Sequence, residues 1–159
     1  QSVFYKIKNL EDCKWFARLT ADNPLISVNL AKNLISRIDE KLDYIAYKKN
    51  IPNGSAIELI NKITFLKINS DDLDKVQQEH VTPFFYENKD KFNTLFLKAS
   101  KYYFLRDLRI TVDYEEDYKL VKELFEINQN ITLEEVIELY KKDLRIFDLN
   151  KNCIQNKIR

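Results

Sequence analysis

The chain has 159 residues, of which 45% are hydrophobic and 32% are charged; this suits one folded domain and excludes an intrinsically disordered chain. Its 26 basic and 25 acidic side chains nearly cancel, so the charge gives no reason to expect a nucleic-acid or anionic-membrane partner. No apolar run approaches the roughly 20 residues of a membrane span, and no signal peptide is recognisable.

The first third of the chain predicts a helix, a strand and a second helix. Residues 2–10 have the pattern expected at the end of an amphipathic helix, and Trp15–Leu19 is a short apolar run that favours a buried strand. Pro24 then prevents a helix from continuing. Ser27 is a suitable N-cap for the helical apolar stripe that follows, which extends to about Leu42.

The middle of the chain predicts two strands joined by a turn, and then a helix. The strands are Asp43–Tyr47 and Ala56–Ile60, and the turn between them, Pro52–Ser55, contains the only glycine of the chain. The segment Asp71–Tyr86 has a helical pattern that is interrupted or ended near Pro83.

The last third predicts two strands and two helices. The strands are Thr94–Lys98 and Leu108–Val112, and the first helix is Glu115–Glu126. The second helix begins at Thr132, because Thr132 and Glu135 have the spacing of a capping box.

The alternation of strands and helices favours an α/β fold, a three-layer sandwich with a mostly parallel sheet. Residues 1–149 form the folded portion in this prediction, and the polar residues 150–159 form a tail. Ligands of open α/β sheets bind at the carboxyl ends of strands. Asp22 and Asp113 each follow a predicted strand, and together they indicate a candidate cation site.

Each of these aspartates also has a purely structural interpretation. A carboxylate at a strand end can hold Mg²⁺, which takes one or two carboxylates together with water and substrate phosphates. Asp22 can instead form an Asx-turn ahead of Pro24. Asp113 and Glu116 can form a capping box for the helix that follows, which would fix the carboxylate without excluding a cation role.

The cysteines and the single histidine argue against other kinds of site. Cys13 and Cys153 are far apart and belong to no C-x-x-C pair, so we expect neither a zinc site nor a disulfide framework, and we expect a reducing, cytoplasmic environment. His80 has no neighbouring nucleophile motif, so its local sequence favours a structural or surface role over a catalytic triad.

Three segments, in this order and spacing, resemble one enzyme family. They are Arg18–Ile26 (RLTADNPLI), Glu79–Asn88 (EHVTPFFYEN) and Arg109–Asp117 (RITVDYEED). They are similar to motifs of the cytidylyltransferases named for spore-coat polysaccharide biosynthesis, and the resemblance covers about residues 3–149. The same superfamily includes the synthetases that join CMP to acidic sugars such as 3-deoxy-octulosonate and sialic acid.

The resemblance implies a reaction and a set of partners. The fold would be of the nucleotide-diphospho-sugar transferase, Rossmann-like type, and the enzyme a Mg²⁺-dependent nucleotidyltransferase that activates a sugar or acidic sugar with CTP for surface polysaccharide biosynthesis. Pyrophosphate would leave from CTP. A homodimer would form through residues 43–68.

The resemblance also implies roles for individual residues. The catalytic residues would be Arg18, Asp22 and Asp113, and the magnesium ligands would be Asp22 and Asp113. Substrate would be bound by Glu58, Glu79, His80 and Arg109.

Some positions depart from the family pattern. Ala56 replaces a usual aspartate, and Tyr114-Glu115 replaces a usual Thr-Pro pair. Nothing in the chain matches the family's Gly/Ser-containing nucleotide loop, so we expect the N-terminal nucleotide-binding part to be missing and the chain to be a C-terminal portion. The alternatives are guanylyl or other nucleotidyl transfer to a sugar phosphate, and a degenerate, non-catalytic interaction domain.

Overall fold

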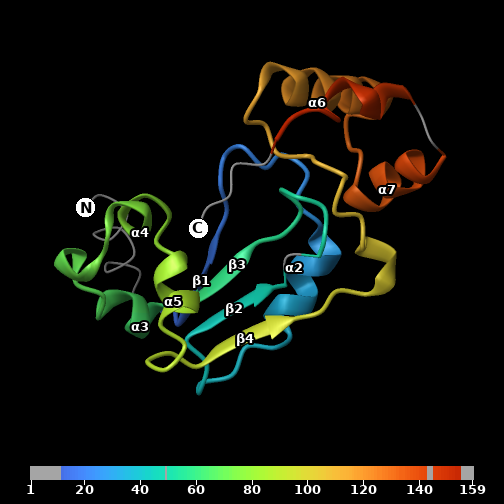
Figure 1. The fold of residues 1–159 in the computed structure, drawn as a ribbon. Helices are drawn as coiled ribbons and strands as arrows, with labels where there is room; N and C mark the ends of the chain where they lie inside the picture. The colour runs from blue at the N-terminus through green and yellow to red at the C-terminus, as the bar shows by residue number, and fades with distance from the viewer. Residues whose placement is uncertain (1–11, 49, 143–144, 155–159) are drawn as a thin grey trace.

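A computed structural model describes residues 12–48, 50–142 and 145–154 (Figure 1). The helix expected at residues 2–10 lies outside this range. The strands are β1 (Trp15–Arg18), β2 (Tyr44–Tyr47), β3 (Glu58–Asn61) and β4 (Thr94–Leu97). The helices are α2 (Val28–Ile35), α3 (Lys62–Leu66), α4 (Lys75–His80), α5 (Pro83–Glu87), α6 (Glu115–Ile127) and α7 (Leu133–Lys141), with 3-10 helices η1 (Ser70–Asp72), η2 (Lys101–Tyr103) and η3 (Arg145–Leu149).

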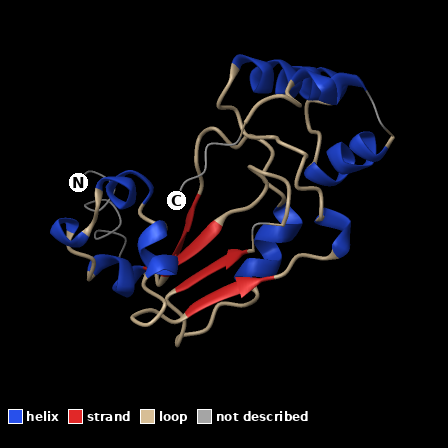
Figure 2. Ribbon diagram, viewed as in Figure 1, coloured by secondary structure: helices blue, strands red, loops and turns tan. Residues whose placement is uncertain are grey.

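The four strands form one mixed sheet in the order β1-β3-β2-β4 (Figure 2). β2 pairs in parallel with β4, whereas β3 pairs antiparallel with both β1 and β2. The expectation of a mostly parallel sheet is therefore corrected for the described strands. The physical reason is the turn at Pro52–Ser55, which sends the chain back so that β3 is inserted between two strands that run the other way.

Hydrophobic side chains cover both faces of this sheet. Ile45 and Leu59 belong to a cluster that includes residues of α2, α6 and α7. Tyr44 and Ile60, their neighbours in sequence, belong to a second cluster with Phe65 of α3 and Phe85 of α5. Because successive strand side chains point to opposite faces, the sheet is a middle layer between two sets of helices.

Three expected elements differ from the structure. α2 ends at Ile35 rather than near Leu42, because the next residues are exposed and make only short turns towards β2. The helix expected over residues 71–86 is divided into η1, α4 and α5, with Pro83 as the first residue of α5. The strand expected at residues 108–112 is a single parallel bridge between Asn53 and Arg109, because its partner is a turn.

Two helix starts are as expected. The hydroxyl of Ser27 accepts the N–H of Leu30 at 3.1 Å at the start of α2. At the start of α7, Thr132 and Glu135 form the reciprocal capping box, with hydrogen bonds of 2.8 and 3.2 Å. Among the described helices none is long and apolar enough to cross a membrane.

Candidate active site

Three loops meet at one edge of the sheet. β1, β2 and β4 run in the same direction and β3 runs against them, so the carboxyl ends of three strands and the start of β3 share this edge. The loops are 19–25 after β1, 50–57 before β3, and 108–114 before α6. We call this arrangement the three-loop site.

Backbone hydrogen bonds hold the three loops together. The N–H of Val112 donates to the carbonyl of Asp22 at 2.8 Å, and the N–H of Ile110 donates to the carbonyl of Asn53 at 3.0 Å. The hydroxyl of Thr111 also reaches the carbonyl of Asp22, at 3.4 Å. The segments that carry Asp22 and Asp113 are therefore direct neighbours, although the residues before Asp113 form only a single bridge and not the expected strand.

Gly54 makes this close approach possible. It has φ +87°, and a Cβ atom there would lie 2.8 Å from Oδ1 of Asn23 and 2.9 Å from the backbone N of Thr111. Both contacts are shorter than real Cβ atoms make, and the positive φ disfavours L side chains. The glycine is thus required by conformation and by space at the point where the loops touch.

Gly54→Ala is expected to lower the free energy of unfolding by about 2 kcal/mol or more, since a strained backbone is combined with a clash against backbone atoms. Urea unfolding followed by circular dichroism measures this loss. Ser100→Ala is a control, because Ser100 is exposed and its side chain makes no capping hydrogen bond; it should change stability by less than about 0.5 kcal/mol. Equal stability of the two variants would contradict the role of Gly54.

Asp22 has a buried oxygen that the fold does not satisfy. The turn is closed by Asn23, whose N–H donates to the carbonyl of Thr20 at 3.2 Å and whose amide donates to the Thr20 hydroxyl at 2.6 Å. Oδ1 of Asp22 is buried and has no hydrogen-bond partner among the described residues. Because buried polar oxygens are nearly always paired with protein, water or an ion, this atom is a candidate contact for a water molecule or a ligand.

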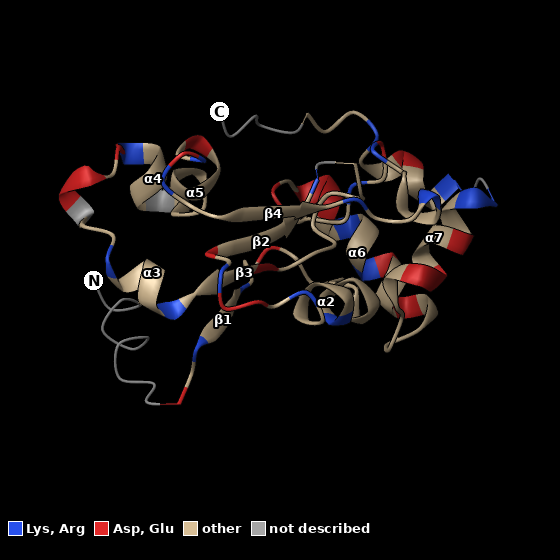
Figure 3. Cartoon of the chain, turned by 90° about the horizontal axis from the view of Figure 1, so that it is seen from below, with Lys and Arg blue, Asp and Glu red and all other residues tan. Residues whose placement is uncertain are grey.

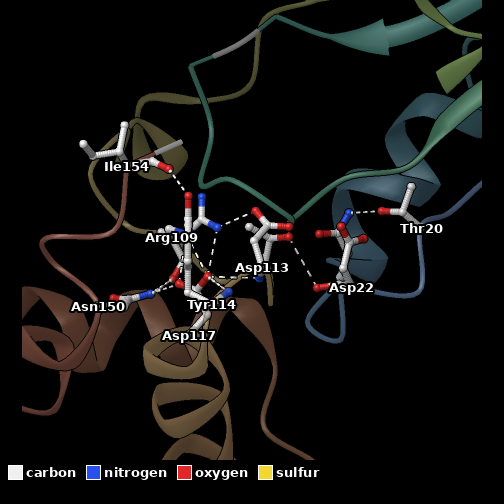
Figure 4. A network of polar contacts seen from close by, with 10 residues as sticks. Thr20, Asp22, Arg109, Asp113, Tyr114, Asp117, Asn150 and Ile154 are labelled. Carbon is white, nitrogen blue, oxygen red and sulfur yellow. Dashed lines mark hydrogen bonds and ion pairs between the residues drawn. The ribbon is translucent and has the colours of Figure 1, made fainter. Parts of the chain in front are cut away.

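Asp113 is held by the neighbouring Arg109. Nη2 of Arg109 forms an ion pair with Oδ2 of Asp113, whose side chain remains 38% exposed. Figure 4 shows Asp113 between Arg109 and the loop that carries Asp22. Asp113 therefore presents a fixed carboxylate at the edge of the three-loop site.

Arg109 lies deeper than we expected of a substrate-binding residue. Its side chain is 7% exposed, and its Nε and Nη2 donate to the carboxylate of Asp117 at 2.9 to 3.1 Å. The charge of the guanidinium is balanced by two carboxylates inside the protein. This position makes Arg109 a support for Asp113 and does not favour a direct contact with substrate.

Asp117 is the centre of the network in Figure 4. It is fully buried, and its Oδ2 accepts the backbone N–H groups of Asp113 and Tyr114 at 3.0 and 3.1 Å. Burial alone would raise its pKa, but the hydrogen bonds from Arg109, Asn150 and the two backbone amides outweigh burial and lower it. The expected capping box of Asp113 with Glu116 is therefore wrong: Tyr114 is the N-cap of α6, and Asp117 supplies the carboxylate.

Arg18 and Glu58 face each other across β1 and β3. Their register brings Nη1 of Arg18 to 2.8 Å from Oε2 of Glu58, and both side chains are about three-quarters buried. The hydroxyl of Tyr44 donates to the other oxygen of Glu58, and burial together with the charge of Glu58 raises the Tyr44 pKa. Two residues expected to act on phosphates and sugar are thus a preformed pair beside the site.

The segment that contains Glu79 and His80 reaches this pair through α5. The side chain of Glu79 lies outside the described part of the structure, and His80 is the last residue of α4. Val81 follows with φ +46° and ψ −49°, and the N–H of Thr82 donates to the carbonyl of His80, which is the pattern of a strained γ-turn. The pKa of Tyr86 in α5 is raised by burial and by the negative charges of Glu87 and Glu58.

Several residues of the site had no sequence signal strong enough to find them. Asp117 is part of the Arg109–Asp117 motif, yet its burial does not follow from its type. Contrary to what its sequence predicts, Asn150 is not part of a polar tail, because it is 6% exposed and donates to Asp117 at 2.8 Å. Residues 155–159 of the predicted tail lie outside the described range.

Charges elsewhere on the molecule are mixed in sign. Acidic and basic residues are interspersed over the described helices (Figure 3), and on α6 Lys119 pairs with Glu115 and Lys122 with Glu126. Cys13 and Cys153 are free thiols. Within residues 12–48, 50–142 and 145–154, no group of three or more histidine, cysteine or carboxylate side chains could hold a metal ion.

Comparisons with known proteins agree with this architecture. A family model described as Cytidylyltransferase matches residues 2–154. An uncharacterized protein of Methanocaldococcus jannaschii, MJ1063, is 31% identical over 98% of this chain and 65% of its own length. The spore coat polysaccharide biosynthesis protein SpsF of Bacillus subtilis is 32% identical over 69% of this chain and 46% of its own length.

A solved structure shares the fold. It is that of a cytidylyltransferase from Leptospira borgpetersenii serovar Hardjo-bovis, which matches with a TM-score of 0.81 and 20% identity over 98% of this chain and 66% of that one. The chain thus spans from just under half to about two thirds of the proteins it matches. The match of the family model over residues 2–154 confirms the predicted resemblance, and the chain belongs to the cytidylyltransferase family.

Proposed function

We propose that this chain forms part of a Mg²⁺-dependent cytidylyltransferase that activates a sugar or acidic sugar with CTP. One observation carries the proposal: Asp22 and Asp113 lie on adjoining loops, and Oδ1 of Asp22 is buried with no hydrogen-bond partner among the described residues. A cation at this position would satisfy that oxygen. The name of SpsF, a protein of polysaccharide biosynthesis, supports a role in surface glycan synthesis.

The donor set suits Mg²⁺ better than a transition metal. Asp22 and Asp113 offer only hard carboxylate oxygens, and no cluster of three or more ligating side chains surrounds them in the described part of the chain. Mg²⁺ usually takes one or two carboxylates and completes its shell with water and substrate phosphates. Bound there, it would neutralise the charge that develops on the phosphates during transfer.

The reaction requires the protein mainly to position the substrates and to neutralise the charge on the phosphates. A hydroxyl or phosphate oxygen of the sugar forms a bond to the α-phosphorus of CTP, a hydroxyl releasing its proton to solvent, while the bond from that phosphorus to the bridging oxygen of the β-phosphate breaks and pyrophosphate leaves. Arg18 is held by Glu58 beside the three-loop site, where its cation adds to the field that favours anionic substrate. Glu58, whose side chain is 24% exposed and is held by Arg18 and Tyr44, would accept hydrogen bonds from sugar hydroxyls.

Pyrophosphate release tests this function. The complete protein is incubated with Mg²⁺, one nucleoside triphosphate and a panel of acidic and neutral sugars and sugar phosphates. The expected result is release that requires CTP, Mg²⁺ and a sugar together. Release with GTP but not with CTP would identify the reaction as guanylyl transfer. No release with any triphosphate would favour a non-catalytic interaction domain.

A further inference from the structure

Asn150 joins the two ends of the segment that carries Asp113. Its amide Nδ2 donates to Oδ1 of Asp117 at 2.8 Å and to the backbone carbonyl of Arg109 at 3.0 Å. The side chain comes from the chain beyond η3, and it is 6% exposed. One neutral group therefore ties the start of the loop at Arg109 to the first turn of α6 at Asp117.

The residues after Asn150 return to the same loop. The N–H of Cys153 donates to the carbonyl of Asn150 at 2.9 Å, which closes a turn. The hydroxyl of Tyr114 then donates to the carbonyl of Ile154 at 3.3 Å, and the guanidinium of Arg109 lies 5.5 Å from the centre of the Tyr114 ring. Figure 4 shows Asn150 and Ile154 near Arg109 and Tyr114.

We propose that residues 150–154, through Asn150, are a positioning element that fixes Asp113 for cation binding in the three-loop site. The contacts form a continuous chain. Asn150 orients the carboxylate of Asp117, which accepts the backbone N–H of Asp113 and also holds the guanidinium of Arg109. Arg109 in turn binds Oδ2 of Asp113 and so fixes the orientation of this carboxylate, whose side chain remains 38% exposed.

This inference rests on the proposed function for the identity of the cation. Loss of the Asn150 amide removes no charge, so Arg109 and the two carboxylates stay balanced. It removes one of the hydrogen bonds that orient Asp117 and the one that holds the Arg109 carbonyl, which loosens the Asp113 backbone and weakens a cation site before it unfolds the protein. Groups that orient metal ligands typically contribute a factor of about 10 to 100 in metal affinity.

The test compares Asn150→Ala with two controls in the complete protein. Asn152→Ala changes an exposed asparagine of the same segment. Phe147→Leu destabilises the neighbouring η3, where Phe147 packs on Tyr140, without touching the network. Each variant is titrated with Mn²⁺ in the absence of substrate, with free Mn²⁺ read by electron paramagnetic resonance, and its pyrophosphate release is measured against Mg²⁺ concentration.

Asn150→Ala is expected to raise the Mn²⁺ dissociation constant and the half-saturating Mg²⁺ concentration by about 10-fold or more, with most of the rate recovered at saturating Mg²⁺. Both controls should keep wild-type values, although Phe147→Leu lowers the Tm. A lower Tm for Asn150→Ala with unchanged metal affinity would overturn the proposal. So would a wild-type protein that binds no Mn²⁺. If wild type binds Mn²⁺ but releases no pyrophosphate, the proposed function fails while the Mn²⁺ titration still decides this inference.

Discussion

Asp22→Asn is expected to reduce Mg²⁺-dependent pyrophosphate release from CTP by about 100-fold or more. The physical reason is that the variant removes the charge from the oxygen that we assign to the cation, and fixed charge stabilisation of a transition state typically contributes factors of about 100 to 1,000. Steady-state kinetics with the complete protein measure the loss. Unchanged turnover would remove Asp22 from the site.

Stability separates this loss from misfolding. In metal-free buffer the Asp22→Asn protein should have a Tm equal to or above that of wild type, because the substitution removes a buried charge whose Oδ1 has no partner among the described residues. Added Mg²⁺ should raise the Tm of wild type and not of the variant. Asp90→Asn, at an exposed position in the turn before β4, is the matched control and should behave as wild type.

Asp117→Asn is expected to be the most destabilising single substitution considered for this chain, with a loss of about 3 kcal/mol at pH 7. It breaks a fully buried ion pair and leaves the charge of Arg109 balanced by the half-exposed Asp113 alone. Urea unfolding gives the difference. Glu115→Gln is the matched control on the same helix turn, where an exposed pair with Lys119 should contribute less than about 1 kcal/mol.

The contribution of Asp117 to the free energy of unfolding should decrease as the pH is lowered. The pKa of Asp117 is lowered in the folded protein, so its ionised form contributes stability above its unfolded pKa of about 4. That contribution is lost as the pH falls through the lowered folded pKa. Wild type and Asp117→Asn should therefore differ most near neutral pH and converge in acid; a constant difference from pH 7 to pH 3 would contradict the assignment.

Local signals in the sequence predicted the parts of the fold that depend on local chemistry. Ser27 and Thr132 cap helices because of their own hydroxyls, and the apolar run at β2 is buried on both faces. The rule that ligands collect at the carboxyl ends of strands applies to Asp22, which follows β1, whereas Asp113 follows a single bridge and is brought alongside by the backbone hydrogen bond from Val112 to Asp22. The resemblance to the cytidylyltransferase motifs is what implies a reaction for these residues.

Long-range placement could not be predicted in the same way. A strand of four residues has no mark of direction, so the insertion of β3 between β1 and β2 depends on the turn at Gly54 and on what packs around it. Nothing in the sequence around Arg109 indicates that its cation is buried; its burial depends on the ion pair with Asp117. Asn150 lies 33 positions from Asp117 in a polar stretch, and no local pattern distinguishes it from its neighbours.

The separation of these partners along the chain has a consequence for synthesis. The β2–β3 connection is local and can form early, but the contact of Thr111 with Asp22 spans 89 positions, and Asn150 follows both. Non-local contacts form late in folding because loop closure must precede them. Because Asn150 supplies contacts to both Arg109 and Asp117, the network that holds Asp113 is complete only after residue 150 has emerged from the ribosome.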